Sequence, residues 1–307
     1  MAAVVTCEHV IKRYGDLVAV DDVGLRVEEG EVFGLVGPNG AGKTTLIEML
    51  EGLRTPDSGS IRVLGLDPTR QARELKERMG VQLQTTSIQP NMKVKEAVRL
   101  FASLYQRPLP HPEELLKTLS LEDKQNSRFR KLSGGQKQRV AVALALVNDP
   151  SVLFFDELTT GLDPQGRRSM WDLVRDIRRR GKTVFLTTHY MEEAEHLCDR
   201  VAVIHHGKFI ALDTPENLVR SLRGGSKVLF QVEGKDVAVS AFEKLAGVSR
   251  AEKVEGGFVL FTTDEDRTLQ ELVRLADREG FRLASIRTES PDLDDVFLTL
   301  TGRELRE

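Results

Sequence analysis

A glycine-rich loop at residues 37–44, with the sequence GPNGAGKT, restricts the possible folds of this chain more than any other segment. An apolar run over residues 32–36 precedes the loop, and a segment with helical spacing begins near Lys43. Glycines let successive backbone N–H groups turn toward an anion without Cβ clashes, and the following helix presents its positive N-terminal end to the same anion. The strand–loop–helix order therefore predicts a phosphate-binding loop of the P-loop kind.

The loop pattern assigns roles to individual side chains. Lys43 is predicted to reach the β- and γ-phosphates of a bound nucleotide, and the Thr44 hydroxyl is predicted to ligate Mg²⁺. The residues predicted to contact the nucleotide in this segment are Gly37, Pro38, Asn39, Gly40, Ala41, Gly42, Lys43, Thr44 and Thr45.

A second apolar strand, predicted at residues 152–155, ends in two adjacent acids, Asp156 and Glu157. Adjacent strand residues point in opposite directions, so we expect the two carboxylates to have different roles. Asp156 is predicted to organise the ligands of Mg²⁺. Glu157, just beyond the strand, is predicted to polarise an attacking water as general base.

The chain pattern predicts an α/β protein with an N-terminal antiparallel β subdomain and a helical insertion. Strands are expected at residues 4–10 and 17–27, and the helical insertion at about residues 93–132. Strands then alternate with helices, which predicts a mostly parallel sheet covered by helices. The first helix of the insertion is expected between Lys93 and Tyr105, where helical spacing is followed by the apolar positions Val94, Ala97, Val98, Phe101, Leu104 and Tyr105.

A change in composition at residues 224–226, Gly-Gly-Ser, predicts a linker between two domains. The domains are therefore expected at residues 1–223 and 227–307. The second domain shows a βαββαβ order, which predicts a small ferredoxin-like α+β fold. Its second helix is predicted to present one apolar face, formed by Leu269, Leu272, Val273 and Ala276.

Composition bounds the possible partners. The net charge is −3 with 30% charged residues, so we expect no nucleic-acid partner. The two cysteines, Cys7 and Cys198, form no CxxC pattern, which is typical of a reducing cytosol. The longest apolar stretch, residues 140–147, is shorter than the roughly 20 residues of a membrane-spanning helix. We predict a cytoplasmic chain, for which another polypeptide supplies any membrane part.

Two segments carry a resemblance to a known family. LSGGQKQR at residues 132–139 and SVLFFDE at residues 151–157 resemble the signature motif and the Walker B strand of the ABC-type ATPases. The resemblance extends from about residue 3 to about residue 220. It implies ATP hydrolysis with Mg²⁺ in a homodimer, in which two ATP molecules lie between the subunits.

The signature segment has a physical role in such a dimer. Ser133 is a predicted helix N-cap, and Gly134 and Gly135 would leave N–H groups open at the positive end of that helix. The resemblance implies that these residues, with Gln136, contact the ATP held by the other subunit.

The resemblance also implies roles for single residues. Tyr14 would stack on the adenine ring, and Gln84 would approach Mg²⁺ and link the site to a membrane partner. Asp163 belongs to the segment that matches the D-loop, residues 161–163. His189 matches the switch histidine that contacts the γ-phosphate.

Within the family the chain resembles the drug-resistance, daunorubicin-type ATPases, which work with a separate ABC-2-type permease. The matching segments are THYMEEAE at residues 188–195 and DLDDVFLTLTGRE at residues 292–304. By resemblance to the family, Phe101, Leu104 and Tyr105 are expected to dock the permease. Two positions depart from the family pattern, because Leu158 and Leu83 stand where proline is usual. Neither departure removes a catalytic group, and both change the backbone freedom of their loops.

Other functions fit parts of the pattern. A non-transport ABC ATPase acting on ribosomes or nucleic acid is the main alternative, but such proteins usually carry tandem ATPase domains or long coiled coils, and this chain has neither. A non-hydrolysing ATP-gated regulator is a third hypothesis, and Glu157 and His189 argue against it. We therefore predict export of a drug, a lipid-like compound or another small molecule, with the cargo unspecified by the sequence.

Overall fold

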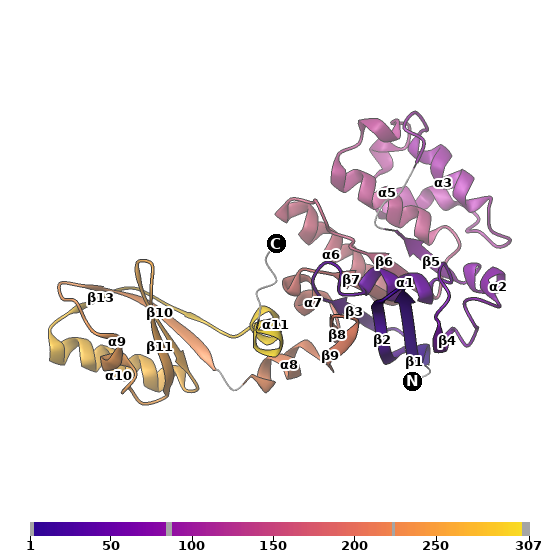
Figure 1. Cartoon of the computed structure of the whole chain (residues 1–307). Helices are drawn as coiled ribbons and strands as arrows, with labels where there is room; N and C mark the ends of the chain where they lie inside the picture. Colours follow the sequence, from indigo (N-terminus) through magenta and orange to yellow (C-terminus); the bar gives the residue numbers. More distant parts are fainter. Residues whose placement is uncertain (1–2, 84–87, 223–224, 303–307) are drawn as a thin grey trace. The chain divides into compact units, whose positions relative to one another are not determined.

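The computed structural model describes residues 3–83, 88–222 and 225–302, and the chain divides into two compact units, Met1–Pro215 and Glu216–Glu307 (Figure 1). The predicted domain boundary at residue 223 lies later in the chain than this division, and the predicted domain limits stay predictions. None of the helices in the described ranges combines the length and apolar character needed to span a bilayer.

A six-stranded sheet forms the centre of the first unit, in the order β5-β6-β7-β3-β8-β9. Neighbouring strands are parallel except for β8 and β9, which form an antiparallel hairpin. β3, β6 and β7 are buried along their whole length, as expected for parallel strands covered on both faces. The predicted α/β fold is confirmed. The strands are β3 (Val32–Val36), β5 (Met79–Gln82), β6 (Val152–Asp156), β7 (Thr183–Thr188), β8 (Arg200–His205) and β9 (Lys208–Asp213).

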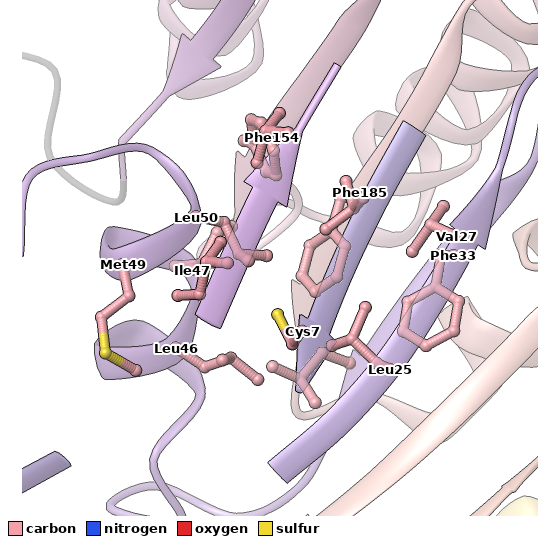
Figure 2. Close-up of a cluster of buried hydrophobic side chains, with 14 of the residues drawn as sticks. Cys7, Leu25, Val27, Phe33, Leu46, Ile47, Met49, Leu50, Phe154 and Phe185 are labelled. Atoms are coloured by element: carbon pink, nitrogen blue, oxygen red, sulfur yellow. The ribbon is translucent and has the colours of Figure 1, made fainter. Parts of the chain in front are cut away.

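Helix α1 (Lys43–Leu50) is fixed to this sheet by its apolar face. Leu46, Ile47 and Leu50 belong to one buried cluster with Phe154 of β6 and Phe185 of β7 (Figure 2). Burial of each such side chain contributes about 1.5–3 kcal/mol. The packing therefore holds the start of α1, and the glycine loop before it, in a fixed position at the carboxyl ends of the strands. Two further helices, α6 (Pro164–Arg179) and α7 (Met191–Leu197), contact β7.

A separate antiparallel sheet, in the order β2-β1-β4, forms the predicted N-terminal subdomain. Its strands are β1 (Ala3–Tyr14), β2 (Leu17–Glu28) and β4 (Ser58–Val63). The hairpin between β1 and β2 turns at Gly15, whose φ of 57° suits glycine. Both strands of the hairpin are longer than the sequence pattern predicted.

The predicted helical insertion contains α3 (Val94–Ala102), which contacts α5 (Gly134–Leu146). The helix is shorter than predicted, and Leu104, beyond its end, is 70% exposed. The helix ends at Ala102, and the Leu104 N–H donates to the Phe101 carbonyl at 3.1 Å in a tighter turn. The shorter helices nearby are α2 (Ala72–Lys76) and α4 (Leu115–Thr118), with 3₁₀ turns at Pro112–Glu114, Glu122–Lys124 and Phe129–Lys131.

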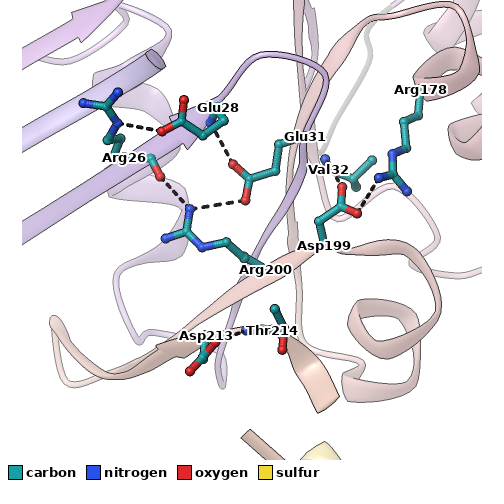
Figure 3. Close-up of polar contacts among 9 residues, drawn as sticks. All are labelled: Arg26, Glu28, Glu31, Val32, Arg178, Asp199, Arg200, Asp213 and Thr214. Carbon is teal, nitrogen blue, oxygen red and sulfur yellow. Dashed lines mark hydrogen bonds and ion pairs between the residues drawn. The ribbon is translucent and has the colours of Figure 1, made fainter. Parts of the chain in front are cut away.

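A polar network joins β2 to the start of β3 and to β8 (Figure 3). The Arg200 guanidinium donates to the Arg26 carbonyl at 3.0 Å and to Glu31 Oε1 at 3.3 Å. The other Glu31 oxygen accepts from the Glu28 N–H at 2.7 Å. Glu31 is 7% exposed, and its carboxylate accepts hydrogen bonds from donors on both sides.

Glu31→Ala is expected to lower the free energy of unfolding by about 1–3 kcal/mol, because it leaves the Glu28 N–H without its acceptor and removes one of the two acceptors that Arg200 has among the described residues. The measurement is urea unfolding of the intact chain. Glu29→Ala, at an exposed neighbouring position, is the control and should change stability by at most about 0.5 kcal/mol. Equal effects of the two variants would contradict the assigned role of the network.

The second unit contains the four-stranded antiparallel sheet β11-β12-β10-β13. Its βαββαβ order and strand positions are those of a ferredoxin-like fold, as predicted. Phe230, Phe242 and Phe258 lie at the centre of its own apolar core. The elements are α8 (Pro215–Ser221), which begins at the division, β10 (Ser226–Glu233), α9 (Val239–Phe242), β11 (Val248–Val254), β12 (Gly257–Thr262), α10 (Glu265–Glu279), β13 (Arg282–Glu289) and α11 (Leu293–Thr301).

One local prediction for this unit was wrong. Val273 is 47% exposed, and the buried face of α10 instead contains Leu275, together with Leu272 and Ala276. Ser226, the last residue of the predicted linker, pairs with Thr262 as the first residue of β10. Val273 and Leu275 both lie near Leu272 on the helix, so helical spacing alone did not show which of the two is buried.

Candidate functional site

The glycine loop lies at the carboxyl end of β3 and passes close to other backbone segments. A Cβ atom on Gly37 would lie 2.3 Å from the Ile204 carbonyl oxygen. At Gly42, where φ is 109°, a Cβ atom would lie 2.2 Å from the Ala19 carbonyl oxygen. Both contacts exclude any side chain, and Gly40 has a positive φ of 77°. The sequence therefore needs glycine for the shape of the loop as well as for anion binding.

Lys43 points back over the loop. Its ammonium donates to the Gly37 carbonyl at 2.8 Å and to the Pro38 carbonyl at 3.1 Å, and its side chain is 4% exposed. Burial lowers the pKa of Lys43, while the carboxylates of Glu157 and Asp156 oppose that shift. The loop thus holds a buried cation next to the N-terminus of α1, where a phosphate group would complement it.

Asp156, the last residue of β6, is buried beside β7. The Thr187 hydroxyl donates a hydrogen bond to Asp156 Oδ1. Burial raises the pKa of Asp156, and the hydrogen bond from Thr187 lowers it. Thr187 was missed by the sequence reasoning, although a polar pair at the end of the apolar strand TVFLTT was a usable signal.

Glu157 has an unusual backbone conformation, with φ at 52°. Its N–H donates to the Thr187 carbonyl at 3.2 Å, and Glu157 Oε2 accepts from the Thr160 hydroxyl at 3.2 Å. Left-handed backbone in a residue other than glycine is strained and is found often at functional sites. The turn directs Glu157 Oε1 to within 3.9 Å of Lys43 Nζ and 3.4 Å of His189 Nδ1.

The structure therefore brings together four of the predicted site residues: Lys43, Asp156, Glu157 and His189. They come from the ends of the neighbouring strands β6 and β7 and from the start of α1, which follows β3. Thr44 and Thr45 lie beside them in the first turn of α1. A cation, two carboxylates and an imidazole at these distances can bind an anionic substrate and polarise a water molecule.

The signature residues form a different cluster at the start of α5. The Ser133 hydroxyl accepts from the Gln136 N–H at 3.3 Å, and the Gln136 side chain accepts from the Ser133 N–H at 3.0 Å. This capping box confirms the predicted N-cap. A Cβ on Gly135 would meet nothing within 4 Å, and one on Gly134 would touch only Leu162 at 3.9 Å. Packing within the chain does not require these glycines, so their small size leaves the N–H groups accessible.

Asp163 caps the neighbouring helix α6 by accepting from the Gly166 N–H at 3.1 Å. The two helix starts share a groove of about 600 Å³.

The structure does not define the predicted nucleotide contacts of Tyr14 and Gln84. Tyr14, at the end of β1, is 40% exposed, and the Arg54 guanidinium lies 5.2 Å from its ring centre. Its role at the adenine ring stays a prediction. Gln84 lies outside the described residues. Of the two departures from the family pattern, Leu158 is 2% exposed and packs in the core, whereas Leu83 is 43% exposed.

Comparisons with known proteins identify relatives of this chain. A sequence profile described as ABC transporter matches residues 20–160. The chain is 41% identical over 306 residues to the Nod factor export ATP-binding protein I of Burkholderia thailandensis, which covers 98% of this chain and 97% of that protein. It is also 41% identical over 303 residues to the protein of that name from Rhizobium etli, with coverages of 97% and 93%.

Solved structures show the same similarity. An ATP-binding subunit of an ABC transporter matches with a TM-score of 0.64 and 27% identity, over 71% of this chain and 92% of that one. A bacterial ABC transporter cassette solved as a dimer matches with a TM-score of 0.62 and 27% identity, over 68% and 98% of the two chains. The fold and the site define an ATP-hydrolysing cassette of the P-loop class. The chain belongs to the family of ABC transporter ATP-binding subunits.

Proposed function

We propose that this chain is the energy-coupling subunit of an exporter, in which two copies close around two Mg-ATP and drive a separate membrane permease. The observation that carries export is the similarity, over nearly the whole chain, to ATP-binding proteins of Nod factor export. Residues 188–195 and 292–304 support a drug-resistance-type subunit with an ABC-2-type permease. The proposed cargo is a drug, a lipid-like compound or another small molecule, and the proposed location is the cytoplasmic face of the membrane, held by the permease.

The geometry supports a role for each residue in hydrolysis. Lys43 would bind the β- and γ-phosphates, and His189 would contact the γ-phosphate. Glu157 would accept the proton of the attacking water, since its carboxylate is held by Thr160 and faces both of these groups. Gln84 would approach the metal and the permease.

The residues near the phosphate position fit Mg²⁺. The Thr44 hydroxyl and the Asp156 carboxylate are oxygen donors, which Mg²⁺ prefers, and Mg²⁺ is commonly held by one or two protein groups plus substrate phosphates. No group of three or more His, Cys, Asp or Glu side chains able to hold a metal occurs in the described part of the chain, which is consistent with a metal that arrives with the nucleotide. When bound, Mg²⁺ neutralises charge on the phosphates.

The signature cluster supports the proposed dimer. Gly134 and Gly135 present open N–H groups at the N-terminus of α5, a helix of 13 residues, where an anion is favoured. A two-fold axis would place this cluster against the ATP of the second copy, with Ser133, Gln136 and Asp163 at the same interface. Each ATP would then bind both copies and hold the dimer closed until hydrolysis.

An apolar cavity supports a docking position for the permease. The cavity, of about 790 Å³, lies between the helical insertion and the edge of the central sheet. We call it the docking groove; its apolar lining includes Leu53, Val81, Leu83, Phe101, Leu104 and Tyr105. Leu53, Leu83 and Leu104 are 53%, 43% and 70% exposed, an arrangement that favours coverage by another protein.

Leu104→Asp is expected to weaken permease binding at least about tenfold, equivalent to about 1.4 kcal/mol, because a charge would enter an apolar interface. The measurement is the amount of permease that co-purifies with the tagged chain from detergent-solubilised membranes. Leu100→Asp is the matched control, since Leu100 is 47% exposed on the same helical segment but does not line the docking groove. Unchanged permease binding and transport in Leu104→Asp would show that the permease docks elsewhere.

A further inference from the structure

A buried carboxyl group lies at the docking groove without a partner. Glu51, the C-cap residue of α1, is 1% exposed and lines the cavity. Its backbone N–H donates to the Ile47 carbonyl at 2.9 Å, but neither side-chain oxygen has a hydrogen-bond partner in the structure as described. Buried polar groups without partners are few in native proteins, so this one needs an explanation.

The cations that line the cavity do not pair with Glu51. Arg73 and Lys76 line the same cavity, yet among the described residues neither forms an ion pair with Glu51. The other acid of the cavity, Glu77, differs from Glu51 because its carboxylate accepts from the Gln106 N–H at 3.0 Å. Glu51 alone of these groups combines full burial with unused hydrogen-bonding capacity.

Burial is the main influence on the charge state of Glu51. Burial, together with the nearby carboxylates of Asp156 and Glu48, raises the pKa of Glu51 to about 9. In the isolated chain burial thus favours the protonated form of Glu51, whose O–H donor and acceptor oxygens remain unused. A cation placed here would satisfy the Glu51 oxygens directly, with the carboxyl proton released to solvent as the ion pair forms.

We propose that Glu51 binds one lysine or arginine side chain carried on the apolar segment of the permease that enters the docking groove. The proposal rests on the docking position proposed above. The apolar lining suits the methylene stem of such a side chain, while its charged end reaches the buried carboxyl. Glu51 would thus select a permease segment with a basic residue, and it lies at the end of the helix whose start carries Lys43 and Thr44.

The test uses a small cation of matched shape, n-octylguanidinium, with n-octanol as its neutral counterpart. Binding of each compound to the intact chain, with Mg-ADP present, is measured by calorimetry at pH 7. The wild-type chain is expected to bind the cation about 10- to 100-fold more tightly than the alcohol. Glu51→Gln should reduce that preference to about twofold or less, whereas Glu77→Gln should retain it. Equal binding of both compounds to the wild type, or a preference that survives Glu51→Gln, would overturn the proposal.

A second variant separates this result from a failure to fold. Glu51→Leu is expected to raise the Tm of the chain by about 2–4 °C, because it removes an unsatisfied buried group while filling the same space. A lower Tm would show that Glu51 is satisfied within the chain and would overturn the inference. If Leu104→Asp loses the permease but the wild type shows no preference for the cation, only the Glu51 proposal fails. Retained permease in Leu104→Asp would instead remove the docking position itself.

Discussion

Glu157→Gln is expected to lower steady-state ATP hydrolysis by about 10²- to 10⁴-fold while ATP binding persists, because the variant loses a general base and keeps the phosphate loop. The carboxylate is held by Thr160 and faces Lys43 and His189. Glutamine preserves size and hydrogen bonding but cannot accept the proton of the attacking water. ATP should therefore remain bound between two copies, and the closed dimer should accumulate.

Two measurements check this expectation. Phosphate release gives the hydrolysis rate, and light scattering after gel filtration with ATP gives the mass, which should double from that of the 34.3 kDa chain. Glu192→Gln is the control, since Glu192 lies on the nearby helix α7 with its side chain 62% exposed. If Glu157→Gln hydrolyses ATP like the wild type, the assigned base is wrong.

Lys43→Ala is expected to weaken ATP binding by about 10- to 100-fold and to abolish ATP-dependent dimerisation. The ammonium group is buried above the loop, and a charge-assisted hydrogen bond to phosphate contributes about 1.5–3 kcal/mol. The same substitution leaves the carboxylates of Glu157 and Asp156 without the nearby cation that opposes their charge.

The two consequences of this substitution can be measured separately. Thermal melting without nucleotide reports the stability of the chain, and equilibrium binding of labelled ATP reports affinity. Lys43→Met, which keeps most of the side-chain volume, should lose affinity like Lys43→Ala, while Lys208→Ala, at a position 65% exposed, should not. Near wild-type affinity in a well-folded Lys43→Met variant would contradict the assigned role.

The sequence predicted the central part of the fold because its motifs are local. The loop at residues 37–44 requires glycine wherever backbone segments approach closely, and the structure shows such contacts at Gly37 and Gly42. The acids at the end of β6 could be placed beside the loop because parallel strands share one carboxyl edge. The capping role of Ser133 followed in the same way from helix chemistry.

The features that could not be predicted depend on contacts between distant segments. The Thr187 hydroxyl donates to Asp156 because β7 pairs with β6. The residues around Thr187 in the sequence do not show which strand lies beside it. In the sequence, Glu51 is an ordinary polar residue near a helix end. Its burial depends on the packing of segments that are distant in the sequence, including the helical insertion. Helix α3 was predicted to extend to Tyr105 because the apolar spacing continues that far, although the helix ends at Ala102.

The most direct test of the central claim, that this ATPase drives a separate permease, is affinity purification of tagged Glu157→Gln from detergent-solubilised membranes of the source cells with Mg-ATP. The double variant with Lys43→Ala serves as the control for dependence on bound ATP. We expect a multi-spanning membrane protein to co-purify with Glu157→Gln and to decrease in the control. Recovery of ribosomal proteins or nucleic acid in place of a membrane protein would contradict the transporter function and leave only the ATPase.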